Sequence, residues 1–170
     1  MHLRKLEPKD APLMLEWMHE PSVVEDLHTD FGEKTLEDCI AFINESEGND
    51  RIHLAIVDDS DEYLGTVSLK NIDSSSAEFA IIIRKCAMGK GISIYAMKEM
   101  LRIGLEEMKL NCIYWCVAPE NKRAVRFYDK NGYARYTPDS EAMEKLGLYS
   151  ISDIEHYIWY RVTATDTEHI

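Results

Sequence analysis

The chain has 170 residues, of which 45% are hydrophobic and 29% charged, and its formal net charge at pH 7 is -12. This length suits one domain, and no apolar run is long enough to cross a bilayer. The acidic balance argues against general nucleic-acid binding, which depends on Lys and Arg neutralising phosphates, and it mildly favours cationic partners.

Neither the N-terminus nor the cysteines indicate secretion or a metal site. Charges in the stretch from Met1 to Glu7 fall where a signal peptide needs its apolar segment, so we expect a cytoplasmic protein. The cysteines form no CxxC pair, and the histidines form no ligand-spaced cluster with them. We therefore expect free thiols and no bound metal. The cysteines are Cys39, Cys86, Cys112 and Cys116.

The first third of the chain predicts a strand and two helices. Residues 3–6 can start a strand, and apolar residues at helical spacing predict a helix from Asp10 to Glu20, which Pro21 stops. After an irregular acidic stretch, Thr35 is a suitable N-cap for a second helix, which ends before Gly48.

The middle of the chain predicts a sheet and a long helix. Two strands, 52–57 and 63–72, are joined by a turn-rich linker typical of a hairpin, and a third strand covers Ala77 to Ile83. Amphipathic periodicity predicts a helix from Ile92 to Met108, and residues 112–117 form a buried strand.

The C-terminal part predicts a helix from Asn121 that ends at Gly132, where glycine can adopt the left-handed conformation. Residues 139–146 can form one or two helical turns, and 156–162 a final strand. We expect one domain over residues 1–162, with 163–170 as a flexible tail.

The loop Met88-Gly89-Lys90-Gly91-Ile92-Ser93 is the first segment that points to chemistry. It lies between a strand and a helix, and a helix N-terminus offers free backbone N–H groups and a positive dipole end to a phosphate. Its spacing matches neither the P-loop nor the dinucleotide fingerprint. Taken alone, the loop is explained equally well by a tight turn.

A second segment, Val117 to Tyr133, contains the pattern Asn-x-x-Ala-x-x-x-Tyr-x-x-x-Gly, from Asn121 to Gly132. Together with the upstream loop it resembles the GNAT family of N-acetyltransferases, and the resemblance covers residues 3–160. It implies a mixed α+β fold, with a twisted and mostly antiparallel sheet of about seven strands flanked by about four helices and splayed between its fourth and fifth strands. It also implies acetyl-coenzyme A as cofactor.

The resemblance implies roles for residues of this second segment. Asn121 would contact the pantetheine arm, Arg123 would bind the cofactor as well, and the Tyr128 hydroxyl would protonate the departing thiolate. Asn121 and Tyr128 are two turns apart on one helix face, so one elongated ligand can reach both. An N-cap role for Asn121 and a core role for Tyr128 are the structural alternatives.

The predicted strand from Ala77 to Ile83, the fourth of the chain, is expected to supply a base and backbone groups. Glu78 is the one ionisable residue between Ala77 and Ile83, and it resembles the acidic residue that several relatives use to deprotonate the amine. An exposed strand-edge acid is the alternative. The resemblance also implies that backbone groups of Ile81, Ile82 and Ile83 pair with pantetheine.

Two residues of the loop depart from the family pattern. Met88 stands where relatives usually carry Arg or Gln, and Ser93 where Gly or Ala is usual. The backbone donors of Gly89, Gly91 and Ile92 remain, with Lys90 beside them. Weaker cofactor affinity is therefore one expectation, and Met88→Arg should tighten binding.

The resemblance also implies that the stretch from Trp17 to Phe31 contacts the acceptor, through Trp17, Glu25, Asp30 and Phe31. An acidic and partly aromatic wall suits a polyamine or another cationic amine. The family resemblance also implies an amino sugar as an alternative small-molecule acceptor. Acetylation of a protein N-terminal amine of the ribosomal-protein type stays open, as does a non-catalytic acyl-coenzyme A-binding module. A homodimer also stays open.

Overall fold

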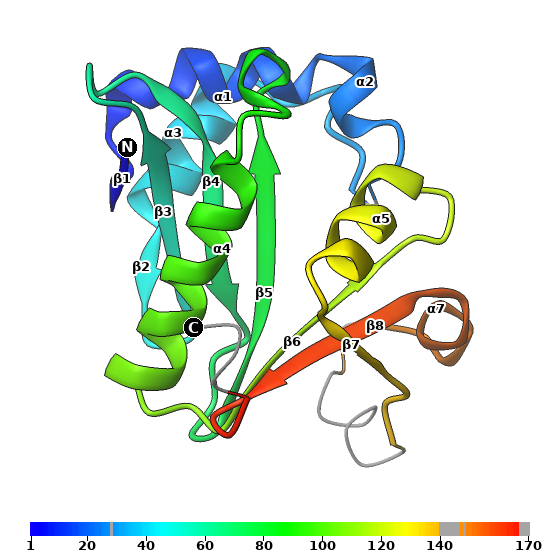
Figure 1. Cartoon of the computed structure of the whole chain (residues 1–170). Helices are drawn as coiled ribbons and strands as arrows, with labels where there is room; N and C mark the ends of the chain where they lie inside the picture. The colour runs from blue at the N-terminus through cyan, green and yellow to red at the C-terminus, as the bar shows by residue number, and fades with distance from the viewer. Residues whose placement is uncertain (28, 140–146, 148, 167–170) are drawn as a thin grey trace.

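The computed structural model describes residues 1–27, 29–139, 147 and 149–166 (Figure 1). Its strands form one eight-stranded sheet in the order β1-β3-β4-β5-β6-β8-β7, with β2 paired to β3. The strands are β1 (His2–Lys5), β2 (Glu47–Gly48), β3 (Arg51–Val57), β4 (Tyr63–Lys70), β5 (Ser76–Ile83), β6 (Cys112–Val117), β7 (Ala134–Tyr136) and β8 (Ile158–Thr163). The α-helices of the described residues are α1 (Ala11–Met18), α2 (Pro21–Val24), α3 (Leu36–Asn44), α4 (Ile92–Arg102), α5 (Lys122–Lys130) and α7 (Ile151–His156).

The two faces of the sheet carry separate cores. On one face, α4 and α5 bury apolar side chains against β4 to β6 and β8, with Met97, Trp115 and Tyr128 among them. On the other, α1 and α3 pack on β3 through Met14, Cys39 and their neighbours. The helices on both faces confirm the mixed α+β layering expected from the sequence.

The sheet opens between β5 and β6, and this opening creates room for a ligand. These two strands run parallel and pair only from Ser76 with Cys112 to Glu78 with Tyr114. Beyond these pairs they diverge, as Figure 1 shows, while β5 stays paired with β4 as far as Ile83. The splay expected between the fourth and fifth predicted strands is therefore confirmed.

The N-terminal helices follow their capping residues, with one correction. The helix α1 ends at Met18, and Pro21 does not act as a stop but begins α2, where its missing N–H is not needed. The Glu20 side chain caps α2 by accepting from the Ser22 N–H at 3.3 Å. The predicted N-cap Thr35 is confirmed, in a reciprocal capping box with Asp38.

The long predicted helix covers the expected residues but changes its winding. The α-helix α4 ends at Arg102, and a π-helical turn continues from Ile103 to Glu107. Gly104 lies in this turn, where an added Cβ would come within 2.5 Å of the Ile113 side chain. The wider turn brings the chain close to β6.

The C-terminal part holds two elements that the sequence did not predict, β7 and α7. The final strand begins at Ile158 rather than His156, because His156 is the last residue of α7. Gly132 has the predicted positive φ, 79°. The predicted turns over 139–146 lie almost wholly outside the described residues, as do residues 167–170, and Thr163 closes β8.

Candidate active site

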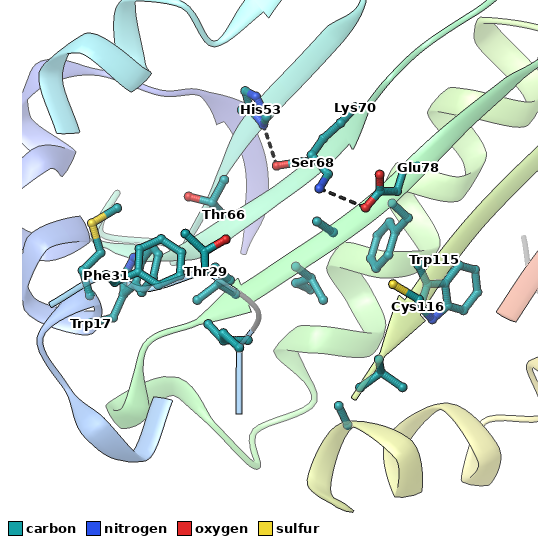
Figure 2. A pocket seen from close by; sticks show the side chains of 18 of the residues that line it. Trp17, Thr29, Phe31, His53, Thr66, Ser68, Lys70, Glu78, Trp115 and Cys116 are labelled. Carbon is teal, nitrogen blue, oxygen red and sulfur yellow. Dashed lines mark hydrogen bonds and ion pairs between the residues drawn. The ribbon is translucent and has the colours of Figure 1, made fainter. Parts of the chain in front are cut away.

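A cavity of about 610 Å³ runs from the segment between α1 and α3 to the opening between β5 and β6 (Figure 2). Its walls include residues 78–82 of β5 and 115–118, from β6 and the turn after it. Ala124 and Tyr128 of α5 also line it. The opening in the sheet is thus continuous with the space beside α1 and α3.

Glu78 lies buried on the wall of this cavity, with 4% of its surface exposed. Lys70 Nζ lies 3.0 Å from Glu78 Oε1, and the Tyr149 hydroxyl donates to the same oxygen at 2.9 Å. Asn71 Nδ2 donates to Oε2 at 2.8 Å. The exposed strand-edge alternative is therefore wrong. Three partners fix the orientation of this carboxylate.

Tyr128 lies in the core and also lines the cavity. Its ring packs on Trp115 and Tyr160, at centroid distances of 5.3 and 5.0 Å. Burial raises the pKa of the Tyr128 hydroxyl well above its ordinary value, so the group keeps its proton at neutral pH. A buried neutral phenol at a cavity wall can donate a proton to a developing anion.

Asn121 is both the N-cap of α5 and part of the cavity wall. Its Oδ1 accepts from the Ala124 N–H at 3.0 Å, and only 6% of the residue is exposed. The cap uses the carbonyl oxygen, so the side-chain amide nitrogen keeps two donors for a ligand. The structural alternative is confirmed and leaves room for a binding role.

The loop before α4 has the backbone geometry of an anion cradle. Gly89 and Gly91 have φ values of 75° and 77°, in the left-handed region that other residues rarely adopt. A Cβ placed on either glycine would meet nothing within 4 Å, so both face open space. The first N–H groups of the eleven-residue helix α4 have no intrahelical acceptor. A phosphate therefore fits this loop.

The side chains of the loop divide between solvent and core. Lys90 is exposed, Ser93 is half-buried in the first turn of α4, and Ile92 is buried in the core. Met88 is half-buried, and its Sδ accepts from Arg123 Nη1 at 3.2 Å. The lining of the cavity does not include residues 88–93, but this contact ties the loop to α5.

The predicted acceptor residues divide into two groups. Trp17 and Phe31 line the cavity and pack edge to face, with ring centroids 5.1 Å apart. Glu25 and Asp30 are exposed and do not line it. The acidic residues that do line the cavity near them are Asp26, Asp38 and Glu45.

Several polar residues of the wall were missed by sequence reasoning. Thr66, Ser68 and Lys70 alternate along β4 and face the cavity beside His53 of β3 (Figure 2). This period of two, within a largely apolar strand, was the signal that could have found them. Tyr149 follows from no local pattern.

His53 contributes a neutral polar group to the cavity wall. Its Nδ1 lies 2.7 Å from Ser68 Oγ, and its ring lies against Phe42. Burial, and then the charges of Arg51 and Lys70, lower the pKa of His53 to about 4. At neutral pH the imidazole is uncharged.

The splayed sheet, the glycine loop at the start of α4 and the cavity that reaches the splay are together typical of an acyltransferase of the GNAT class. The acetyltransferase (GNAT) domain family matches residues 1–134, so the chain belongs to this family of acetyltransferases. The family uses acetyl-coenzyme A as acyl donor.

Curated relatives and solved structures agree with this assignment. Acetyltransferase PseH of Campylobacter jejuni is 20% identical over 137 residues, which are 81% of this chain and 85% of PseH. An uncharacterised N-acetyltransferase, p20, of Bacillus licheniformis is 27% identical over 139 residues, 78% of each chain. The spermidine N-acetyltransferase of Vibrio cholerae, solved with CoA and spermine, superposes with a TM-score of 0.77 at 19% identity, over 99% of this chain and 96% of that one. At this identity the superposition shows the fold.

Two absences among the described residues accompany this assignment. None of their helices combines the length and the apolar character needed to span a bilayer. Nor do their His, Cys, Asp and Glu side chains gather into a set that could hold a metal ion.

Proposed function

We propose that this protein transfers the acetyl group of acetyl-coenzyme A to a primary amine of a small molecule, by direct attack within a ternary complex. One observation carries the proposal: Glu78 and Tyr128 line the same cavity, at the place where β5 and β6 part. A fixed carboxylate and a protonated phenol are the two groups that amine acetylation requires.

Several groups of the chain suit the cofactor, which supplies the acetyl thioester when bound. The amides of residues 89–93, with Lys90 and the Ser93 hydroxyl, would hold the pyrophosphate. Backbone groups of residues 81–83, which have no strand partner on the β6 side, would pair with pantetheine. Asn121 and Arg123 would add donors from α5.

The two acid–base residues then have distinct tasks. An ammonium has no lone pair for attack, so Glu78 takes its proton, directly or through water. The Tyr128 hydroxyl, which is protonated at neutral pH, gives its proton to the thiolate that leaves.

The acceptor enters from the side of Trp17 and Phe31. A polyamine and an amino sugar both suit an aromatic wall with carboxylates beside it. The fold neighbour from Vibrio cholerae is a spermidine N-acetyltransferase solved with spermine, which supports a small amine as acceptor. A protein N-terminal amine is the alternative acceptor.

The experiment is amine-dependent thiol release from acetyl-coenzyme A over a panel of polyamines, amino sugars and N-terminal peptides. We expect turnover with a small amine, and Glu78→Gln should lower kcat by about 100-fold. If coenzyme A binds in calorimetry and no amine is acetylated, the chain is a non-catalytic acyl-coenzyme A-binding module. Turnover of peptides alone would overturn the small-molecule assignment.

A further inference from the structure

The carboxylate that faces the acceptor already has a cation of the protein beside it. Lys70 and Glu78 are directly opposite partners on β4 and β5, and Lys70 Nζ lies 3.0 Å from Glu78 Oε1. The Lys70 side chain is 38% exposed, and both residues line the cavity. Figure 2 shows the pair on the cavity wall, close to Ser68. The inner end of the cavity is thus neutral rather than acidic.

The Lys70–Glu78 pair should repel an amine with several positive charges more than an amine with one. An amine that loses its proton to Glu78 is uncharged when it attacks, so Lys70 opposes it little. A second ammonium of the same molecule keeps its charge and must stay within a few bonds of the first. The second ammonium of the substrate is then held close to the Lys70 ammonium. In a partly desolvated cavity these two like charges repel strongly.

The surroundings of the pair favour uncharged polar groups. Ser68 and Thr66 present hydroxyls, and each retains hydrogen-bonding capacity after its contact with His53 or Tyr63, because a hydroxyl has one donor and two acceptor sites. The His53 ring is neutral at pH 7. Sugar hydroxyls match such a surface.

The carboxylates near the cavity entrance affect acceptor binding less than Lys70 does. Asp38 on α3 and Glu45, the residue after α3, are exposed, and Asp38 is engaged by Thr35 in the helix cap, whereas Asp26 is half-buried. Exposed charges of this kind contribute little to binding, because water and salt screen them.

We propose that Lys70 is a specificity residue, which selects an acceptor with a single amine and several hydroxyl groups, as in an amino sugar, over diamines and polyamines. This role depends on the proposed function, because it concerns the acceptor of that reaction.

The test compares kcat/KM for glucosamine and for spermidine in the wild type, Lys70→Met and Lys70→Arg. The wild type should prefer glucosamine, and Lys70→Met should shift the ratio toward spermidine by about tenfold or more, since a like charge is removed. Lys70→Arg keeps the charge and should keep the preference. Lys34→Met is the matched control, because Lys34 also lines the cavity but is exposed and forms no ion pair with the described residues.

A second readout needs no turnover. The ratio of the Kd values of the two amines, measured by calorimetry with coenzyme A present, should shift in the same direction in Lys70→Met. A wild type that prefers spermidine, or an unchanged ratio in Lys70→Met, overturns the role of Lys70 and leaves the proposed function standing. Absence of turnover with every amine overturns the proposed function itself.

Discussion

Arg123 of α5 donates to the sulfur of Met88 at 3.2 Å, across 35 residues of sequence. The same Nη1 also donates to the Ser22 carbonyl oxygen at 3.3 Å. A guanidinium therefore lies at the loop position where relatives usually carry Arg or Gln, although it comes from another element. The loop therefore has a second cation beside it, from α5, in addition to its own Lys90.

Arg123→Gln should weaken coenzyme A binding by several-fold, about 1 kcal/mol, because a charged donor beside the proposed phosphate-binding loop is lost. Calorimetric titration with coenzyme A measures this. Arg126→Gln is the control, since Arg126 is exposed on the same helix and, within the part of the chain that the structure describes, forms no hydrogen bond with Met88. An equal loss of coenzyme A affinity in both variants would mean that only the net charge of the helix matters, and not the position of Arg123. Met88→Arg is still expected to bind coenzyme A more tightly than the wild type.

Gly91→Ala should destabilise the protein by about 1 kcal/mol, because Gly91 caps α4 with a φ of 77° that alanine adopts only at a cost. Thermal unfolding should show a Tm lower by about 3 °C. Gly91→Asn should lose less, as Asn tolerates this conformation better. Equal losses for Ala and Asn would point away from backbone strain.

His53 should make stability depend on pH. Its pKa is lowered from 6.5 to about 4 on folding, so the unfolded chain binds the proton first as pH falls. The free energy of unfolding should then decrease through this range by about 2 to 3 kcal/mol from this residue. The contribution is fully present above pH 6.5 and lost as pH falls to 4.

Urea unfolding of the wild type and His53→Asn at about pH 7.5 and pH 4.5 tests this, because the carboxylates affect both proteins alike. The wild type should lose more stability between the two pH values. Parallel losses would mean that His53 is not held neutral by burial.

The elements of the fold that the sequence predicts correctly are those set by patterns local in the chain. The capping box at Thr35, the hairpin of β3 and β4, and the periodicity of α4 each depend on neighbours along the chain. The sequence did not predict α7, although Ser150 and Asp153 form a capping box, or α2, because a proline can either stop a helix or begin one.

The parts of the candidate site that lie in sequence motifs could be predicted. The parts that depend on how neighbouring strands are aligned could not. The pattern from Asn121 to Tyr128 and the glycine loop follow from the sequence. The pairing of Lys70 with Glu78 depends on the register of β4 and β5, which no local signal sets. The path of a loop decides which acid faces the cavity, and it brings Asp26 there rather than Glu25.

The kcat of Tyr128→Phe, measured as amine-dependent thiol release from acetyl-coenzyme A, tests acetyl transfer across the β5–β6 opening most directly. The variant keeps the aromatic packing on Trp115 and loses only the hydroxyl. We expect kcat to fall by about 100-fold, with coenzyme A affinity unchanged. A kcat within about twofold of the wild type would contradict Tyr128 as the acid.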